Sequence, residues 1–179
     1  MTHTFTTDKV AHGYLPTYQR LAQTNPGYLC EIGVGNGDGM IMFDRLGWTV
    51  VGVEIDPARA GIASERTRTA VLVGDATMME PGNGIIVDPL NPPPPFNVIV
   101  DDASHDFATT IMTMSMWWPM LAPGGVYVIE DWSHVEVNMV LAYRLWATGL
   151  ARLAGPDKPF SYVEIQNRGL ILIGKQAGE

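Results

Sequence analysis

The sequence predicts an α/β protein with a doubly wound, mostly parallel sheet of seven strands that closes with an antiparallel hairpin at its C-terminal end. Three observations support this fold class. A short apolar run at residues 28–32 passes through a glycine-rich loop into an apolar helical segment. Four further apolar runs alternate with helical segments, as in parallel sheets covered by helices on both faces. Two final apolar runs flank residues 166–169, whose Asn and Gly suit a hairpin turn.

The individual elements follow from apolar runs, helix caps and prolines. Pro16 and Pro57 suit the first turns of two helices, and Asp56 suits the N-cap of the second. Four consecutive prolines at residues 92–95 forbid regular helix there, and Pro-Gly-Gly at residues 123–125 closes the helix that precedes it. The expected strands are residues 28–32, 48–55, 70–73, 96–100, 126–129, 160–165 and 170–173. The expected helices are residues 16–23, 40–46, 57–66, 106–121 and 135–153, and the Trp and Met residues of the fourth, Met112 and Met114 among them, are assigned to a packed core face.

The composition indicates one globular domain and restricts its partners. The 179 residues are 46% hydrophobic, enough for one core, so residues 1–179 are expected to form a single domain with residues 1–15 as a polar, mobile arm. The 19 acidic residues outnumber the 11 basic ones, which argues against a nucleic-acid partner because such a partner needs a basic face. No apolar run approaches the ~20 residues of a membrane span, and the polar N-terminus does not resemble a signal peptide. The sequence therefore predicts a cytoplasmic protein without a membrane partner, and leaves open whether it forms a homo-oligomer.

The glycine-rich loop predicts a ligand site. Gly33, Gly35 and Gly37 alternate with other residues between a strand and a helix, which lets a ligand approach bare backbone at the helix N-terminus. A dinucleotide fingerprint needs the spacing G-x-G-x-x-G, which these glycines do not have. Glu31, at the strand end before the loop, would repel a pyrophosphate and favour a cationic ligand. The alternative interpretation is a tight turn without a ligand.

An acidic residue followed by alternating glycines resembles the first motif of the class I S-adenosylmethionine (SAM)-dependent methyltransferases. The resemblance implies that SAM is the cofactor and that residues 31–37 contact it. Glu54 stands 21 positions after Gly33, a spacing that suits a carboxylate on the hydroxyls of a ribose. The cofactor site that the resemblance implies also takes in Ile55, Asp75 and Ala76, the last two near the adenine amino group.

Acidic residues stand at the C-terminal ends of five predicted strands. In open α/β sheets these ends form the ligand crevice, whereas a single such acid is often a helix N-cap or a solvated loop residue. Residues 101–102 and 130–131 end strands that should be neighbours, about 4.8 Å apart, so their charges would repel each other. A divalent cation would remove this conflict, and oxygen ligands favour Mg²⁺, with Mn²⁺ or Ca²⁺ as alternatives. The acids that share this position are Glu31, Glu54, Asp75, Asp101, Asp102, Glu130 and Asp131.

Two motifs narrow the resemblance. Residues 101–105, Asp-Asp-Ala-Ser-His, and residues 129–131, Ile-Glu-Asp, resemble the metal-dependent O-methyltransferases that modify macrolide sugars, and the cephalosporin hydroxylase-like proteins. Residues 7–18, with Thr-Asp-Lys at their start, resemble the entry segment of the same group. The proline-rich loop departs from the wider fold, where a helix is common, and this leaves the substrate open. By position, the resemblance implies that Asp102, Glu130 and Asp131 hold the metal and that His105 is the catalytic base. Asp101 would lie next to the metal ligands without binding the metal, and it is included among the cofactor-binding residues.

The predicted function is methyl transfer from SAM to a hydroxyl of a small molecule, a sugar or another natural-product intermediate. The metal would lower the pKa of the hydroxyl, and His105 would take its proton, because histidine titrates close to neutral pH. Trp132, beside Asp131, is a candidate wall of the acceptor pocket. Two alternatives stay open: a metal-independent SAM methyltransferase that acts on nitrogen or on a macromolecule, and a non-catalytic SAM- or nucleoside-binding module. No 2-His-1-carboxylate pattern supports iron-dependent hydroxylation.

Overall fold

The computed structural model describes residues 5–79, 95–132, 160–166 and 169–177. The helix expected at residues 135–153 and most of the proline run at residues 92–95 lie outside the described residues.

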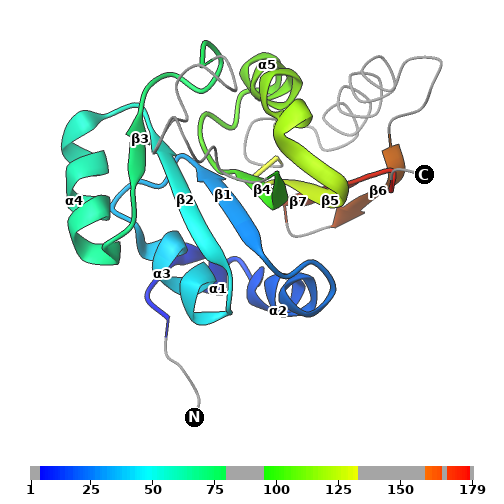
Figure 1. Cartoon of the computed structure of the whole chain (residues 1–179), viewed down its shortest axis with the longest axis horizontal. Helices are drawn as coiled ribbons and strands as arrows, with labels where there is room; N and C mark the ends of the chain where they lie inside the picture. Colours follow the sequence, from blue (N-terminus) through cyan, green and yellow to red (C-terminus); the bar gives the residue numbers. More distant parts are fainter. Residues whose placement is uncertain (1–4, 80–94, 133–159, 167–168, 178–179) are drawn as a thin grey trace.

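Seven strands form one mixed sheet, which confirms the predicted fold class (Figure 1). The strands are β1 (Tyr28–Ile32), β2 (Thr49–Glu54), β3 (Val71–Val73), β4 (Phe96–Asp101), β5 (Leu121–Ile129), β6 (Phe160–Gln166) and β7 (Leu170–Lys175). Their order across the sheet is β3-β2-β1-β4-β5-β7-β6. The first five strands are parallel, whereas β7 pairs antiparallel with both β5 and β6. The C-terminal hairpin therefore completes the sheet beside β5.

Helices cover both faces of this sheet. They are α1 (Asp8–Ala11), α2 (Leu15–Thr24), α3 (Asp38–Arg45), α4 (Pro57–Thr67) and α5 (Phe107–Trp117), followed by the 3₁₀ helix η1 (Trp118–Met120). In Figure 1, α5 lies on one side of the sheet, and α2 and α3 lie on the other. Successive side chains of a strand point to opposite faces. Val98 and Val100 of β4 accordingly share a core with Phe43 of α3, and Ile99 between them shares a core with Trp117 of α5.

The strand order places the ligand crevice at β1. The chain leaves β1 towards β2 by way of α3, and later returns to the other side of β1 as β4, which leads into α5 on the opposite face. At such a switch point the carboxyl ends of neighbouring parallel strands open between the helices on the two faces. The acids that end β1, β4 and β5 are therefore brought to one edge of the sheet.

The helix expected at residues 106–121 is shorter than the sequence indicates. Asp106 caps α5 by accepting a hydrogen bond from the backbone N–H of Thr109, but the helix ends at Trp117. Pro119 explains the early end, because proline has no backbone N–H to donate to the carbonyl of Ser115, and the chain continues as the 3₁₀ helix η1. Leu121 then begins β5, so the Pro-Gly-Gly that was expected to close the helix lies within the strand.

The N-terminal segment contains a helix that the sequence analysis did not predict. The side chain of Thr7 accepts a hydrogen bond from the backbone N–H of Lys9 and caps α1. Thr7, Lys9 and Tyr14 are all buried. Residues 7–14, which the sequence treats as part of a mobile arm, thus pack against the body of the domain in this structure.

Within the part of the chain that the structure describes, no helix is long and apolar enough to cross a membrane.

Candidate active site

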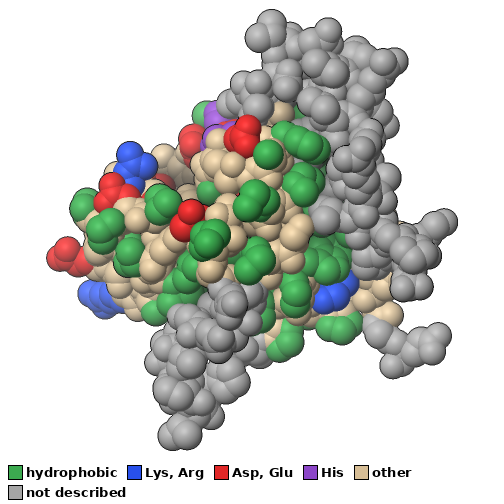
Figure 2. Space-filling view, turned by 90° about the horizontal axis from the view of Figure 1, so that it is seen from above, with side chains coloured by type: hydrophobic (Ala, Val, Ile, Leu, Met, Phe, Trp, Pro, Cys, Tyr) green, Lys and Arg blue, Asp and Glu red, His purple; other side chains and the backbone are tan. Residues whose placement is uncertain are grey.

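A cleft runs along the carboxyl ends of β1, β2 and β4. It consists of two pockets with volumes of about 560 Å³ and 480 Å³. Gly33, Gly35 and Asp102 line both pockets, so the two adjoin at the glycine loop. Figure 2 shows histidine and acidic side chains gathered together at the surface. The cleft lies where the strand order predicts a ligand crevice.

Gly33 lets the glycine loop pass close to the end of β4. Its φ is +86°, a conformation that side chains other than glycine rarely adopt. A Cβ at this position would collide with the carbonyl oxygen of Asp102 and lie 2.7 Å from the Cα of Ala103. Only glycine therefore allows this approach of β1 to β4, and the loop backbone stays accessible from the cleft.

Glu54, at the end of β2, fixes the glycine loop in place. Its Oε2 accepts a hydrogen bond from the backbone N–H of Gly35 at 2.8 Å, and its Oε1 accepts one from the N–H of Asp56 at 3.0 Å. The residue is 6% exposed and lines the larger pocket. Because a carboxylate oxygen can accept more than one hydrogen bond, Glu54 can still receive a ligand hydroxyl.

Apolar side chains are unusually exposed at the larger pocket. Ile55 is 67% exposed and Met112, on α5, is 52% exposed, and both line this pocket together with Asp75 and Ala76. Asp75 accepts hydrogen bonds from the backbone N–H and the hydroxyl of Thr77, which lower the pKa of its carboxyl group. The pocket therefore offers apolar surface for a flat ring beside a charged acceptor.

A buried lysine lies among the acids at the smaller pocket. Lys9 Nζ lies 3.2 Å from Glu31 Oε1, 2.6 Å from Asp102 Oδ2 and 2.9 Å from Glu130 Oε2. Burial by itself lowers the pKa of Lys9, but the charges of Glu130, Glu31 and Asp102 outweigh it and raise that pKa well above its ordinary value. The amine is therefore protonated, and the chain itself supplies a cation to three of the clustered acids.

The carboxylates of this cluster remain crowded despite Lys9. Burial raises the pKa of Glu31 to about 7 and that of Glu130 to about 8, although Lys9 opposes both shifts. Tyr18 donates a hydrogen bond to Glu130, and Tyr14 donates one to Asp131 Oδ1 at 2.5 Å. Burial and these hydrogen bonds raise the pKa of both phenols, so they remain donors.

One buried oxygen of the cluster is unsatisfied. Glu31 Oε2 has no hydrogen-bond partner among the described residues, and Glu31 lines the smaller pocket. A buried polar atom without a partner is costly. A ligand that brings a donor or a positive charge to this pocket would remove that cost.

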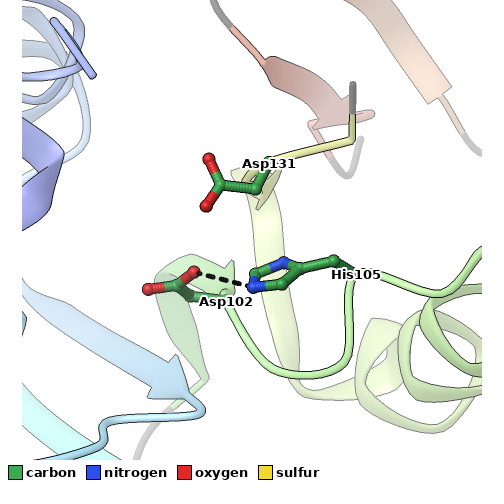
Figure 3. Close-up of side chains that lie close together, drawn as sticks. All are labelled: Asp102, His105 and Asp131. Carbon is green, nitrogen blue, oxygen red and sulfur yellow. Dashed lines mark ion pairs between the residues drawn. The ribbon is translucent and has the colours of Figure 1, made fainter. Parts of the chain in front are cut away.

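Asp102, His105 and Asp131 form a set of donor atoms that could hold a metal ion (Figure 3). One ligand atom from each lies within 4.8 Å of the other two. Asp102 follows β4, Asp131 comes shortly after β5, and His105 lies on the loop that leads into α5. His105 has a φ of +53°, and its Nε2 lies 3.8 Å from Asp102 Oδ1. The two carboxylates of this set suit Mg²⁺ and Mn²⁺.

The structure does not bring every predicted site residue to the cleft. Glu130 lies on Lys9 and Tyr18, outside the set of metal donors, and Gly37 packs against Ala63. Asp101 is 3% exposed, accepts a hydrogen bond from the hydroxyl of Tyr127, and lines neither pocket. Trp132 is 3% exposed and donates its indole N–H to the carbonyl of Gln166, so it packs as core rather than as a pocket wall. The predicted residues that do line the cleft are Glu31, Gly33, Gly35, Glu54, Ile55, Asp75, Ala76, Asp102, His105 and Asp131.

Lys9 and Met112 are among the residues at the cleft that the sequence does not predict for it. Lys9 was known only as part of the motif at residues 7–18, and a lysine in a polar segment gives no sign of burial. Met112 was assigned to the core with Met114, which is 1% exposed, although residues two apart on a helix face in different directions. The helical spacing therefore carried a signal for Met112, whereas Lys9 had none that the sequence alone could reveal.

Comparisons with known proteins agree with this architecture. Residues 30–132, more than half of the chain, match the model of a family described as a methyltransferase domain. No curated protein matches the chain. Three similar solved structures are the MycE methyltransferase from the mycinamycin biosynthetic pathway in complex with Mg, SAH and mycinamycin VI, SAM-bound CalS10, an amino pentose methyltransferase from Micromonospora echinaspora, and an O-methyltransferase from Bacillus cereus in complex with SAH.

The likeness to these structures concerns the fold. MycE has 19% identity and a TM-score of 0.66 over 98% of this chain, which spans 51% of the length of MycE. CalS10 has 15% identity and a TM-score of 0.66, with 95% of this chain and 92% of CalS10 covered. The Bacillus cereus enzyme has 19% identity and a TM-score of 0.61, with 97% and 84% covered. The chain thus has the fold of these methyltransferases, as the sequence predicted.

Asp101 allows a test of the electrostatics of this edge of the sheet. Burial raises the pKa of Asp101 to about 7, so the folded protein binds a proton there that the unfolded chain releases near pH 4. Asp101 therefore makes the folding stability fall as the pH rises from about 4 to about 7. Urea unfolding at a series of pH values measures the slope of the unfolding free energy against pH. In Asp101→Asn this slope should be less negative by up to about 1.4 kcal/mol per pH unit, which corresponds to one proton. An unchanged slope would contradict the buried, protonated state of Asp101, and Asp44→Asn on the exposed face of α3 is the control.

Proposed function

Because the chain belongs to the methyltransferase domain family, we propose that it transfers a methyl group from SAM to a hydroxyl of a small molecule, with a divalent metal and His105 assisting. The acceptor proposed is a sugar or another natural-product intermediate. The observation that carries this proposal is the convergence of Asp102, His105 and Asp131 at the cleft that the glycine loop lines. The complex of MycE with Mg, SAH and mycinamycin VI supports it, since that protein shares the fold.

The two pockets fit the two halves of SAM. The larger pocket suits the adenosine, with the Glu54 carboxylate for the ribose hydroxyls and the exposed faces of Ile55 and Met112 for the adenine ring. The smaller pocket suits the methionine end, where the unpartnered Oε2 of Glu31 can accept a hydrogen bond from the ammonium. Bound SAM supplies an activated methyl group.

The donor set of Asp102, His105 and Asp131 fits a divalent cation in chemical type, and Tyr14 holds the Asp131 carboxylate in position. A divalent cation bound there would stabilise the alkoxide form of the acceptor. One oxygen of Asp102 is held by Lys9, and the other lies 3.8 Å from His105 on the side of the metal donors.

His105 can be a base or a metal ligand but not both. Neutral imidazole has one nitrogen lone pair, and a nitrogen that binds a metal cannot also accept a proton. We assign His105 as the base, because two carboxylates already flank the site and the left-handed backbone at His105 turns the ring towards them. Its Nε2 would take the proton of the acceptor hydroxyl as the methyl group is transferred.

One observation favours a second candidate, methyl transfer without a metal. Lys9 already neutralises part of the acid cluster, so the repulsion between acids does not by itself demand a divalent cation. His105 would then activate the acceptor alone. Chelation of divalent metals distinguishes the two candidates.

Glu54 tests the cofactor site. Glu54→Gln keeps the shape of the side chain but removes the charge and one acceptor, so SAM binding should weaken by roughly 1–3 kcal/mol. Titration calorimetry measures this change. Glu65→Gln, on an exposed turn of α4, is the matched control and should bind SAM normally. Normal affinity in Glu54→Gln would count against the adenosine pocket.

Metal dependence tests the proposed reaction. With SAM and a panel of sugar and other polyhydroxyl acceptors, SAH formation should stop in EDTA and return with Mg²⁺ or Mn²⁺. Asp131→Asn should lose this response while it still binds SAM, because Asp131 belongs to the metal donors. Asp44→Asn should behave as the wild type. Full turnover in EDTA would favour the metal-free candidate, and SAM binding without turnover on any acceptor would favour a binding module.

His105→Ala separates the two roles of that side chain. If His105 is the base, kcat should fall by roughly 10²–10⁴-fold while the affinities for SAM and Mn²⁺ stay unchanged. If His105 is a metal ligand, Mn²⁺ binding in calorimetry should weaken as well. Ser104→Ala, on the same loop, controls for disturbance of the backbone. Normal turnover in His105→Ala would refute the assignment as base.

A further inference from the structure

Lys9 links three strands of the sheet through one ammonium group. Its partners, Glu31, Asp102 and Glu130, stand at the ends of β1, β4 and β5, and its own side chain is only 2% exposed. Surface ion pairs contribute little to stability, but loss of one partner from a buried pair leaves an unpaired charge. The contacts of Lys9 are buried ion pairs, so loss of Lys9 would leave buried charges unpaired.

The fold makes room for this lysine. A Cβ at Gly39, on α3, would collide with Glu31 Oε1 and lie 2.7 Å from Lys9 Cε. The N-cap at Thr7 and the short helix α1 bring Lys9 to the strand ends from the N-terminal side. The glycine at position 39 and the cap at position 7 therefore serve the same contact.

The charges at this edge do not balance with Lys9 alone. Three carboxyl groups, from Glu31, Asp102 and Glu130, contact the ammonium of Lys9. A fourth, that of Asp131, accepts a hydrogen bond from Tyr14, and its Oδ1 lies 3.4 Å from His12 Nδ1. Two of these carboxylates, Asp102 and Glu130, hold Lys9, and both are residues that the sequence assigned to a metal. Lys9 and a divalent cation thus have the same ligands available to them.

We propose that Lys9 is the counter-cation of the acid cluster: it holds the strand ends together without metal and competes with a divalent cation for Asp102 and Glu130. This inference rests on the proposed function for the location of the metal. It also accounts for the position of Glu130, which lies outside the set of metal donors because Lys9 engages it. Glu130 becomes available to a metal when Lys9 withdraws to Glu31.

Thermal unfolding of Lys9→Met in EDTA and in Mg²⁺ tests this competition. Methionine keeps much of the length of the side chain and removes its charge. In EDTA, Tm should fall by roughly 6–20 °C relative to wild type, because three buried carboxylates lose their cation. Addition of Mg²⁺ should raise Tm by more in Lys9→Met than in wild type, and Mn²⁺ should bind at least about tenfold more tightly in calorimetry. Lys175→Met is the matched control, because Lys175 donates to the backbone carbonyls of Trp118 and Leu121 and any loss there should not respond to metal.

A charge-balanced variant keeps the inference testable if Lys9→Met does not fold. Lys9→Met with Glu130→Gln removes one positive and one negative charge, so it should fold in EDTA and its response to Mg²⁺ should return towards that of wild type. A loss of Tm in Lys9→Met that Mg²⁺ does not reverse would overturn the proposal, as would identical behaviour of the single and double variants or failure of both to fold.

The outcome is independent of the proposed reaction. If wild type neither binds Mn²⁺ nor forms SAH but Lys9→Met gains stability from Mg²⁺, the proposed function fails and the role of Lys9 stands. If wild type shows metal-dependent SAH formation and Lys9→Met shows no additional response to metal, the proposed function stands and the role of Lys9 fails.

Discussion

Repulsion between carboxylates at the ends of parallel strands is the constraint on which the rest of this site depends. The register pairs Ile32 with Asp101, and Asp101 with Ile129, so the residues around these positions meet at one edge of the sheet. Sheet pairing alone would leave these acids buried and unpaired, which is among the most costly arrangements in a protein. Lys9 and two tyrosines offset that cost, and the N-terminal segment that carries all three is part of the site for this reason.

The fold could be predicted from the sequence because its signals are local. Strand β1 lies where the apolar run predicts it, and β7, one strand of the C-terminal hairpin, pairs antiparallel with β5. The cleft residues could be predicted in part, because a parallel sheet brings the carboxyl ends of its strands to one edge regardless of how the loops fold. Lys9 could not be predicted, because its partners Asp102 and Glu130 lie 93 and 121 positions away and nothing local marks the contact. The start of β5 was missed because the effect of Pro119 on α5 competes with a strong helical pattern.

The cleft combines two kinds of surface. The larger pocket exposes apolar side chains such as that of Ile55, and Glu54, Arg59, Asp75 and Asp102 also line it. The smaller pocket is lined by acids and by the loop backbone, with one oxygen of Glu31 unsatisfied. The glycine loop lines both regions, and the hydrogen bond from the N–H of Gly35 to Glu54 holds it, so the loop is shaped before any ligand arrives. Preorganised binding groups lose less entropy when a ligand binds, which favours both affinity and correct alignment.

The position of Lys9 also affects when the site can form during synthesis of the protein. Lys9 is made before Glu130, and their contact spans 121 positions, so Lys9 waits on the order of ten seconds for that partner at ordinary elongation rates. Until β5 is made, Lys9, β1 and its glycine loop are present without Glu130, the partner through which Lys9 is joined to the end of β5. The contacts of Lys9 with Glu31, Asp102 and Glu130 are therefore completed late, although Lys9 is made before all three. A nascent chain that stops before residue 130 carries the glycine motif without a completed site.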